Sequence, residues 1–200
     1  MKQEQFEDKE SFFLSELLLW NKKINLVSKK AEKELFIKHL PESYFFIENI
    51  FSNKTLLDVG SGNGFPSIPI AISRPKTNVF CVESNQKKTI FLSSIKKKLL
   101  LENVTILNKN IENLDLSYYN FFDYIIARGF SSPKEIVKKT IKYAKSNAKY
   151  FFYNVFCDND LDGVKSLCGI AINIVDKHVH KLPSGLVRVL YTVTFVKETS

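Results

Sequence analysis

An apolar segment that runs into three closely spaced glycines constrains the fold of this chain more than any other feature. Residues 55–59 read Thr-Leu-Leu-Asp-Val, residues 60–64 read Gly-Ser-Gly-Asn-Gly, and Phe65 and Pro66 follow. Glycine tolerates a positive φ and has no Cβ, so a strand that turns through such a segment lets a ligand lie against bare backbone. The sequence therefore predicts a strand, a sharp turn beside a ligand, and then a helix whose first amide groups face that ligand.

The spacing of the glycines distinguishes two classes of nucleotide site. They stand at positions 60, 62 and 64, whereas the nicotinamide fingerprint places its third glycine one residue later, where Phe65 stands. This disfavours an NAD-dependent oxidoreductase, which stays open as an alternative. The next apolar segment, 78–82, ends in Glu83, whose carboxylate can accept hydrogen bonds from both ribose hydroxyls of a nucleoside. The structural alternative for Glu83 is a solvated acid at the end of a strand.

From Thr55 onward, short apolar segments alternate with helical ones, which is typical of βαβ units and a parallel sheet. Around Pro183-Ser184-Gly185, residues 171–175 and 188–196 are typical of two antiparallel strands. We predict a Rossmann-like α/β sheet, mostly parallel, with a C-terminal antiparallel hairpin. The expected strands are 55–59, 78–82, 103–107, 122–127 and 149–156, and the expected helices are 67–74, 86–101 and 133–146.

The first 50 residues lack this alternation and have the apolar spacing of helices. Residues 4–20 predict an amphipathic helix, and residues 31–50 predict a second helix with a kink or restart at Pro41. A chain of 200 residues holds one sizeable core with a small appendage. We expect a helical cap over 1–50 and one compact catalytic unit over 51–200.

Composition narrows the location and the chemistry of the protein. No apolar run is long enough to span a membrane, and the first ten residues are too charged for a secretory signal, so we expect a cytosolic protein. The three cysteines, Cys81, Cys157 and Cys168, lack the paired short spacings of zinc or redox motifs. We interpret them as reduced packing residues and expect no metal site.

The net charge of +8 is compatible with a polyanionic partner such as RNA, although a nucleotide bias of the source genome would also enrich lysine. Lysine runs are also common on solvated faces that bind nothing. The candidate phosphate contacts are Lys22, Lys23, Lys29, Lys30 and the run Lys96-Lys97-Lys98.

The glycine segment and its surroundings resemble one bacterial family. Residues 58–72 are similar to the corresponding loop of the 16S ribosomal RNA guanine-N7 methyltransferase G family, also called glucose-inhibited division protein B. The most specific stretch is 64–69, because the loops of other methyltransferases lack its two prolines. The resemblance covers residues 20 to about 130, and its other blocks are 20–26, His39-Leu40 with Ser43, Glu83-Ser84, Lys87-Lys88 with Phe91-Leu92, and Phe122-Asp123 with Arg128.

The resemblance implies an S-adenosylmethionine-dependent enzyme that methylates N7 of a guanine in the decoding-region loop of 16S rRNA. It also implies a role for each matching residue. Taken without the family, Ile111 could be ordinary core and Glu112 a surface acid. The implied donor pocket has Gly60, Gly62 and Phe65 against the donor, Glu83 on its ribose, Ile111 and Glu112 around its adenine, and Arg128 closing the site and positioning donor or substrate.

Several positions depart from the family pattern. They bear on substrate contacts more than on donor binding. They are Ser67 in place of a glycine, Asn110 in place of an arginine, Ala127 and Gly129 beside Arg128, and Tyr153-Asn154 in place of a lysine-glycine pair.

Guanine N7 carries an exposed lone pair and no proton, so its methylation requires alignment rather than a general base. The sequence lacks the Pro-Pro-aromatic motif used on exocyclic amines and the Pro-Cys motif used on cytosine C5. We therefore assign no catalytic acid or base, and expect His39 to be structural or to contact RNA. The expected partner is 16S rRNA or the small ribosomal subunit, bound by a monomer. The alternatives are a methyltransferase of another RNA, a protein or a small molecule, or a silent nucleoside-binding module on the ribosome.

Overall fold

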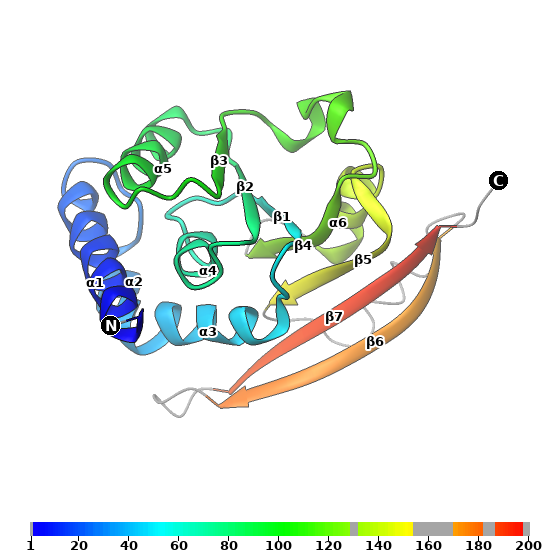
Figure 1. The fold of residues 1–200 in the computed structure, drawn as a ribbon, viewed down its shortest axis with the longest axis horizontal. Coiled ribbons are helices and arrows are strands. Elements are labelled where there is room, and N and C mark those ends of the chain that lie inside the picture. The colour runs from blue at the N-terminus through cyan, green and yellow to red at the C-terminus, as the bar shows by residue number, and fades with distance from the viewer. Residues whose placement is uncertain (1, 129–131, 154–169, 182–186, 198–200) are drawn as a thin grey trace.

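The computed structural model describes residues 2–128, 132–153, 170–181 and 187–197. Its centre is a seven-stranded sheet in the order β3-β2-β1-β4-β5-β7-β6 (Figure 1). Strands β1 to β5 are parallel, and β7 runs antiparallel to both β5 and β6. This confirms the predicted α/β sheet with its C-terminal hairpin. The strands are β1 Thr55–Val59, β2 Asn78–Val82, β3 Val104–Leu107, β4 Phe122–Arg128, β5 Ala144–Tyr153, β6 Ile170–Lys181 and β7 Val187–Lys197.

The strand order reverses at β1, which has β2 on one side and β4 on the other. Open α/β sheets bind ligands at the carboxyl ends of their strands where the order reverses. Val59 of β1 is in register with Val82 of β2, so the glycine turn and Glu83 leave the sheet at the same level. The topology therefore brings the glycine turn and Glu83 together at one point of the sheet edge.

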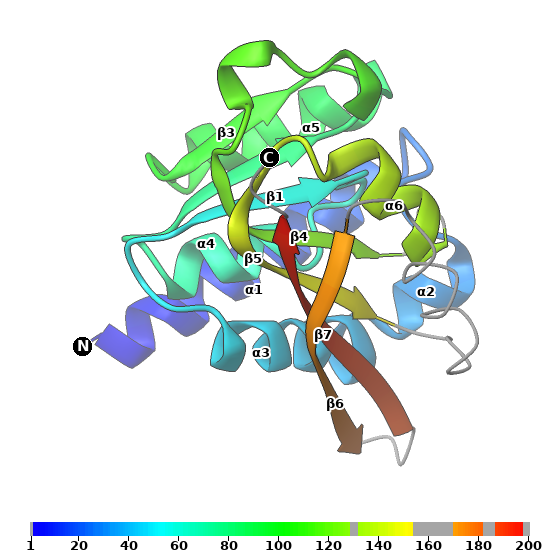
Figure 2. The same cartoon turned by 90° about the vertical axis from the view of Figure 1, so that its right-hand side faces the viewer.

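Helices cover both faces of the sheet (Figure 2). Side chains of β1 alternate between two buried clusters: Leu56 packs with α4 (Ser67–Ser73), α5 (Gln86–Lys98) and the N-terminal helices. Leu57 packs instead with α6 (Pro133–Thr140). This alternation is the period-2 pattern of a strand buried on both faces.

The N-terminal segment consists of α1 (Lys2–Asn21), α2 (Lys29–Lys33), the π-helical turn η1 (Leu35–His39) and α3 (Leu40–Asn49). The predicted second helix is therefore interrupted at Glu34, and Pro41 lies in the first turn of α3. Phe13 and Leu17 of α1 are fully buried in the cluster that includes β1. No helix in the described ranges is both long and apolar enough to cross a membrane.

The predicted helix 133–146 is too long, because α6 ends at Thr140 and β5 begins at Ala144. The buried Thr140 hydroxyl donates to Ile136 O at 2.6 Å and lies 3.0 Å from the Tyr150 hydroxyl. The Tyr143 hydroxyl donates to Leu114 O at 2.8 Å. These contacts fix the turn between α6 and β5. Those of Thr140 with Tyr150 and of Tyr143 with Leu114 join residues well separated in the sequence, so no local pattern predicts them. Residues 154–156 of the predicted fifth strand lie outside the described residues.

Helix α5 ends three residues before the predicted limit, in a motif built around Leu100. Leu100 N donates to Lys97 O at 3.3 Å and Leu101 N donates to Lys96 O at 3.0 Å, the bond pair of a Schellman motif. Leu100 has a φ of 54°, a conformation usually held by glycine at this position, and its side chain is 80% exposed.

We predict that Leu100→Gly raises the free energy of unfolding by about 1 kcal/mol, because it removes the strain of a left-handed leucine and gives up no buried side chain. Urea denaturation measures the change. Leu100→Ala is the control, since it shortens the side chain and keeps the strain. A glycine variant no more stable than the alanine variant would contradict the prediction.

Candidate functional site

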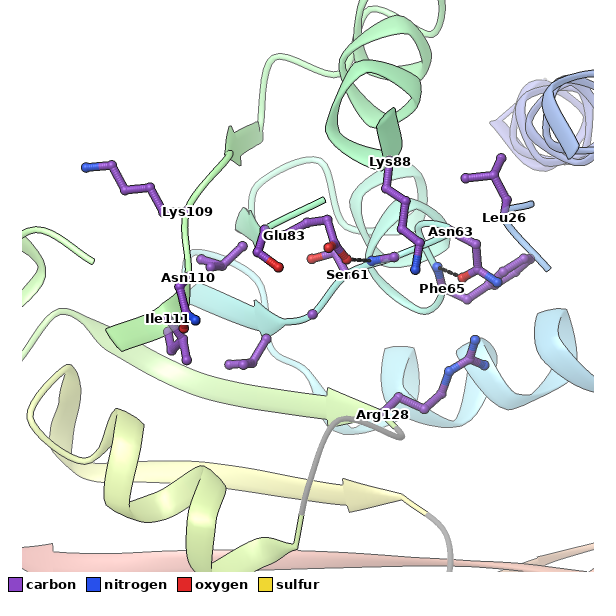
Figure 3. A pocket seen from close by; sticks show the side chains of 15 residues that line it. Leu26, Ser61, Asn63, Phe65, Glu83, Lys88, Lys109, Asn110, Ile111 and Arg128 are labelled. Atoms are coloured by element: carbon purple, nitrogen blue, oxygen red, sulfur yellow. Dashed lines mark hydrogen bonds between the residues drawn. The ribbon is translucent and has the colours of Figure 1, made fainter. Parts of the chain in front are cut away.

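A cavity of about 390 Å³ opens at the carboxyl ends of β1, β2 and β4 (Figure 3). Its volume is in the range of small-molecule sites. Of the seven residues predicted for the site, all but Glu112 line it: Gly60, Gly62, Phe65, Glu83, Ile111 and Arg128. The topology therefore brings together residues from four separate segments of the chain.

The glycine turn forms the floor of the cavity and is held on β2. Gly60, Gly62 and Gly64 have φ values of 75°, 53° and 88°. The amides of Gly60 and Ser61 both donate to Val82 O, at 2.8 and 3.2 Å. A Cβ at Gly64 would lie 2.9 Å from Ile68 Cγ1, so this third glycine lets α4 pack close to the turn.

Glu83 is the one carboxylate among the described residues that line the cavity. Its Oε2 accepts the Gly62 amide at 2.9 Å and its Oε1 accepts the Asn85 amide at 2.8 Å. The side chain is 8% exposed. Each oxygen keeps a further lone pair, so a carboxylate fixed in this way can accept two more hydrogen bonds from a vicinal diol. This arrangement fits the ribose of a nucleoside.

Ile111 begins the 3₁₀ turn η2 (Ile111–Asn113) and gives the cavity an apolar wall. The neighbouring Asn110, in the place of a family arginine, also lines the cavity, and its Oδ1 accepts the Glu112 amide at 3.2 Å. The Glu112 side chain lies elsewhere: its Oε1 is 2.8 Å from Lys139 Nζ, and this hydrogen bond lowers the pKa of Glu112. The structure therefore places the Glu112 carboxylate outside the cavity, on the α6 side.

Arg128, the last residue of β4, joins the cavity to α3. Its Nη1 lies 3.2 Å from Glu42 Oε2 and 3.0 Å from His39 Nδ1, and its Cζ lies 5.8 Å from the centre of the Phe65 ring. The Glu42 side chain is 2% exposed and that of Arg128 16%, so the carboxylate of the ion pair is buried and the guanidinium partly so. His39 Nδ1 also lies 3.4 Å from Glu42 Oε2, so His39, Glu42 and Arg128 form one cluster. His39 thus serves as a structural partner, and Glu42 is a site residue that the sequence analysis missed.

Asp58 is a second acid that the sequence analysis missed, buried beneath the glycine turn. It is 1% exposed, and burial raises its pKa to about 6 despite hydrogen bonds from Ser67 and Ser61 and the charge of Arg128. The Ser67 hydroxyl donates to Asp58 Oδ2 at 2.5 Å. The departure from the family at Ser67 therefore supplies a donor to a buried carboxylate.

Cys81 of β2 lies in register with Asp58 and is fully buried. Burial, followed by the charge of Asp58, raises the pKa of its thiol to about 12, so it packs as an inert residue, as predicted. Cys157 and Cys168 lie outside the described residues, as do Gly129 and Asn154. Within the described ranges, no group of three or more His, Cys, Asp or Glu side chains could hold a metal ion.

The loop after α1 supplies a wall that the sequence analysis did not assign. Leu26 lines the cavity and is 7% exposed. Asn21 fixes this loop, because its Oδ1 accepts the amides of Leu26 and Val27 at 2.8 and 2.9 Å and its Nδ2 donates to Glu32 at 2.6 Å. The block at 20–26 quoted for the resemblance is the signal that could have identified this wall.

Similarity to known proteins shows to which family the chain belongs. The family model described as rRNA small subunit methyltransferase G (GidB) matches residues 7–180. The chain belongs to this family. As a member of the rRNA small subunit methyltransferase G family it is an S-adenosylmethionine-dependent methyltransferase, as the sequence predicted.

Among its relatives is the ribosomal RNA small subunit methyltransferase G of Streptococcus pyogenes serotype M1, 31% identical over 200 residues that cover 96% of this chain and 84% of the relative. Its counterpart from serotype M12 (strain MGAS2096) is 32% identical over 190 residues, 92% of this chain and 80% of that one.

Two solved structures share the fold of this G-family member. M. jannaschii TYW2 in complex with AdoMet has a TM-score of 0.63 at 17% identity, with 80% of this chain and 76% of that one covered. An S-adenosylmethionine-dependent methyltransferase from Aquifex aeolicus has a TM-score of 0.60 at 17% identity, with 79% and 91% covered.

The buried Asp58 predicts a specific pH dependence of stability. Its pKa is about 6 in the folded chain against an ordinary value of 3.8, so its contribution to stability is full below 3.8 and is lost as the pH rises through 6. The loss amounts to about 3 kcal/mol. Asp58→Asn keeps an oxygen that can accept from Ser67 and does not titrate. We predict that the difference in unfolding free energy between wild type and variant changes by this amount between pH 3.5 and 7, measured by urea denaturation. A constant difference would show that Asp58 does not titrate as described.

Proposed function

We propose that this chain transfers the methyl group of S-adenosylmethionine to N7 of a guanine in 16S rRNA, in the loop of the decoding region. The observation that carries the proposal is the cavity in which a buried Glu83 faces the glycine turn, in a chain of the G family. The donor supplies an electrophilic methyl group on a positively charged sulfur.

The residues of the cavity suit the parts of such a donor. Glu83 has acceptor capacity for two ribose hydroxyls, and Ile111 offers an apolar wall for the adenine. Gly60 and Gly62 let the ligand approach the backbone, because neither carries a Cβ. Phe65 and Arg128 lie at the other end, where the guanidinium sits over the ring (Figure 3). We propose these six residues as the donor site, with Glu112 contributing at most its backbone.

The cavity is better suited to alignment than to proton removal. Its described lining holds no histidine, cysteine or aspartate, and both oxygens of Glu83 already accept backbone amides. An acceptor such as guanine N7 loses no proton on methylation, so it needs only to be held in line with the methyl carbon. This chemistry supports N7 over an exocyclic amine as the acceptor.

We also propose that the chain consists of two parts with different roles. Residues 1–50 form a helical cap and residues 51–200 the methyltransferase unit, and the protein acts as a cytoplasmic monomer on 16S rRNA or the small ribosomal subunit. The cap also completes the cavity, since Leu26 lines it and His39 and Glu42 hold Arg128.

The direct test is mass-spectrometric mapping of 7-methylguanosine in 16S rRNA incubated with the protein and the donor, as naked RNA and as assembled small subunits. We expect one modified guanine, in the decoding-region loop of at least one substrate. Methylation of another base or another RNA would favour the alternative of a methyltransferase with a different substrate. Transfer to neither substrate would favour a nucleoside-binding module.

In the same assay, Arg128→Ala should lower kcat/KM at least tenfold, because it removes the guanidinium that lies over Phe65 in the cavity. Arg74→Ala is the matched control: Arg74 also anchors α3, by donating to Ile47 O at 3.0 Å and to Ile50 O at 3.4 Å, and it does not line the cavity. Circular dichroism establishes that both variants are folded at the assay temperature. Wild-type kinetics for Arg128→Ala would refute its proposed role.

A further inference from the structure

A second, smaller cavity lies beside the proposed donor cavity. Its volume is about 210 Å³, and it is lined by Lys23, Ile24, Asn25, Asn85, Lys87 and Lys88. Lys88 lines both cavities, so they are one side chain apart. Figure 3 shows Lys88 reaching from α5 toward Asn63 and the space between the glycine turn and Leu26. A group bound in the second cavity would therefore be a close neighbour of whatever enters the first.

The charge of this small cavity is unbalanced. Three lysines line it and no acid does. Across the part of the chain that the structure describes, none of the three is in an ion pair, whereas Lys98 at the other end of α5 lies 2.7 Å from Glu16. The positive charges of lysines gathered at one cavity repel each other, and an anion bound there relieves that repulsion.

The walls of the small cavity are fixed by hydrogen bonds. The loop that carries Lys23 and Asn25 is held at its base by Asn21, through the amides of Leu26 and Val27. On the opposite wall, Asn85 Oδ1 accepts the amides of Lys87 and Lys88 at 3.0 and 3.3 Å. The cavity therefore has a set shape, which lowers the entropy cost of holding a ligand there.

We infer that this cavity holds a backbone phosphate of single-stranded RNA next to the nucleotide whose base enters the donor cavity. The inference rests on the proposed RNA substrate. A base must leave its stack to be reached, and its flanking phosphates then lie at the mouth of the active site. Lysines bind such phosphates as point charges, fixing the register of the strand without reading its sequence. The cavity has room for a phosphate group and several waters, since one water molecule takes up about 30 Å³.

The structure separates the cavity lysines from one group of predicted phosphate contacts, the run Lys96-Lys97-Lys98. Lys96, Lys97 and Lys98 form the last turn of α5, and Lys97 is about 14 Å along the helix axis from Lys88. Removing two lysines from that end changes the net charge of the protein as much as removing two from the cavity. The two ends of one helix thus provide a matched comparison.

The test uses the full chain with the double substitution Lys23→Gln/Lys87→Gln, and Lys96→Gln/Lys97→Gln as the control. Lys88 is left intact because it also lines the donor cavity. Fluorescence anisotropy measures the affinity for a short single-stranded RNA with a central guanine over a series of salt concentrations. Calorimetry measures the affinity for S-adenosylhomocysteine.

For Lys23→Gln/Lys87→Gln we expect RNA affinity to fall on the order of tenfold at low salt, and the slope of log affinity against log salt to shrink by about 0.7 for each phosphate that the variant no longer neutralises. The control pair should lose much less RNA affinity, and both pairs should bind S-adenosylhomocysteine as the wild type does. An unchanged RNA affinity, or an equal loss in both pairs, would overturn the inference. A loss of S-adenosylhomocysteine affinity alone would also overturn it, because the cavity would then hold the carboxylate of the donor.

This test does not depend on turnover. If the protein transfers no methyl group to 16S rRNA while Lys23→Gln/Lys87→Gln still weakens RNA binding, the proposed function fails and the phosphate site stands. If methyl transfer occurs and this pair binds RNA as the wild type does, the phosphate site fails alone.

Discussion

The site depends on one contact between the segments that follow two neighbouring parallel strands, the hydrogen bond from the Gly62 amide to Glu83. The turn after β1 reaches this position because its glycines adopt positive φ, and Val82 O holds it there by accepting two successive amides. The same turn fixes the side chain of Glu83, an acid that directly follows β2. A preoriented carboxylate binds hydroxyl groups without first losing conformational freedom, and this is why we propose that Glu83 binds the ribose of the donor.

The N-terminal helices are part of the cavity as well as a cover for one face of the sheet. Leu26 supplies a wall, and Glu42 and His39 hold the guanidinium of Arg128 over Phe65. Because Glu42 is buried, loss of Arg128 leaves an uncompensated buried charge, which is costly. Docking of the helices and formation of the cavity are therefore coupled in this protein.

The sequence predicted what depends on local pattern: the strands, the glycine turn and the acid that follows β2. It could not predict contacts that arise only when distant segments meet. In the sequence, Glu42 is typical of a surface acid on a helix, and only the folded chain shows its ion pair with Arg128 of β4. Asp58 is likewise typical of an ordinary strand residue, and only the folded chain shows its hydrogen bond with Ser67 of α4. The early end of α6 has the same origin in the hydrogen bonds of Thr140 and Tyr143. Glu112 stays a prediction as a donor-site position, although its carboxylate pairs with Lys139 outside the cavity.

The central claim is that Glu83 grips the sugar of a sulfonium nucleoside against the glycine turn. Calorimetric titration of the wild type and Glu83→Gln with S-adenosylhomocysteine tests it most directly. The account predicts saturable binding to the wild type and an affinity about 10- to 100-fold weaker in the variant, because hydrogen bonds to a charged group are lost. Equal affinities, or no binding by the wild type, would contradict it.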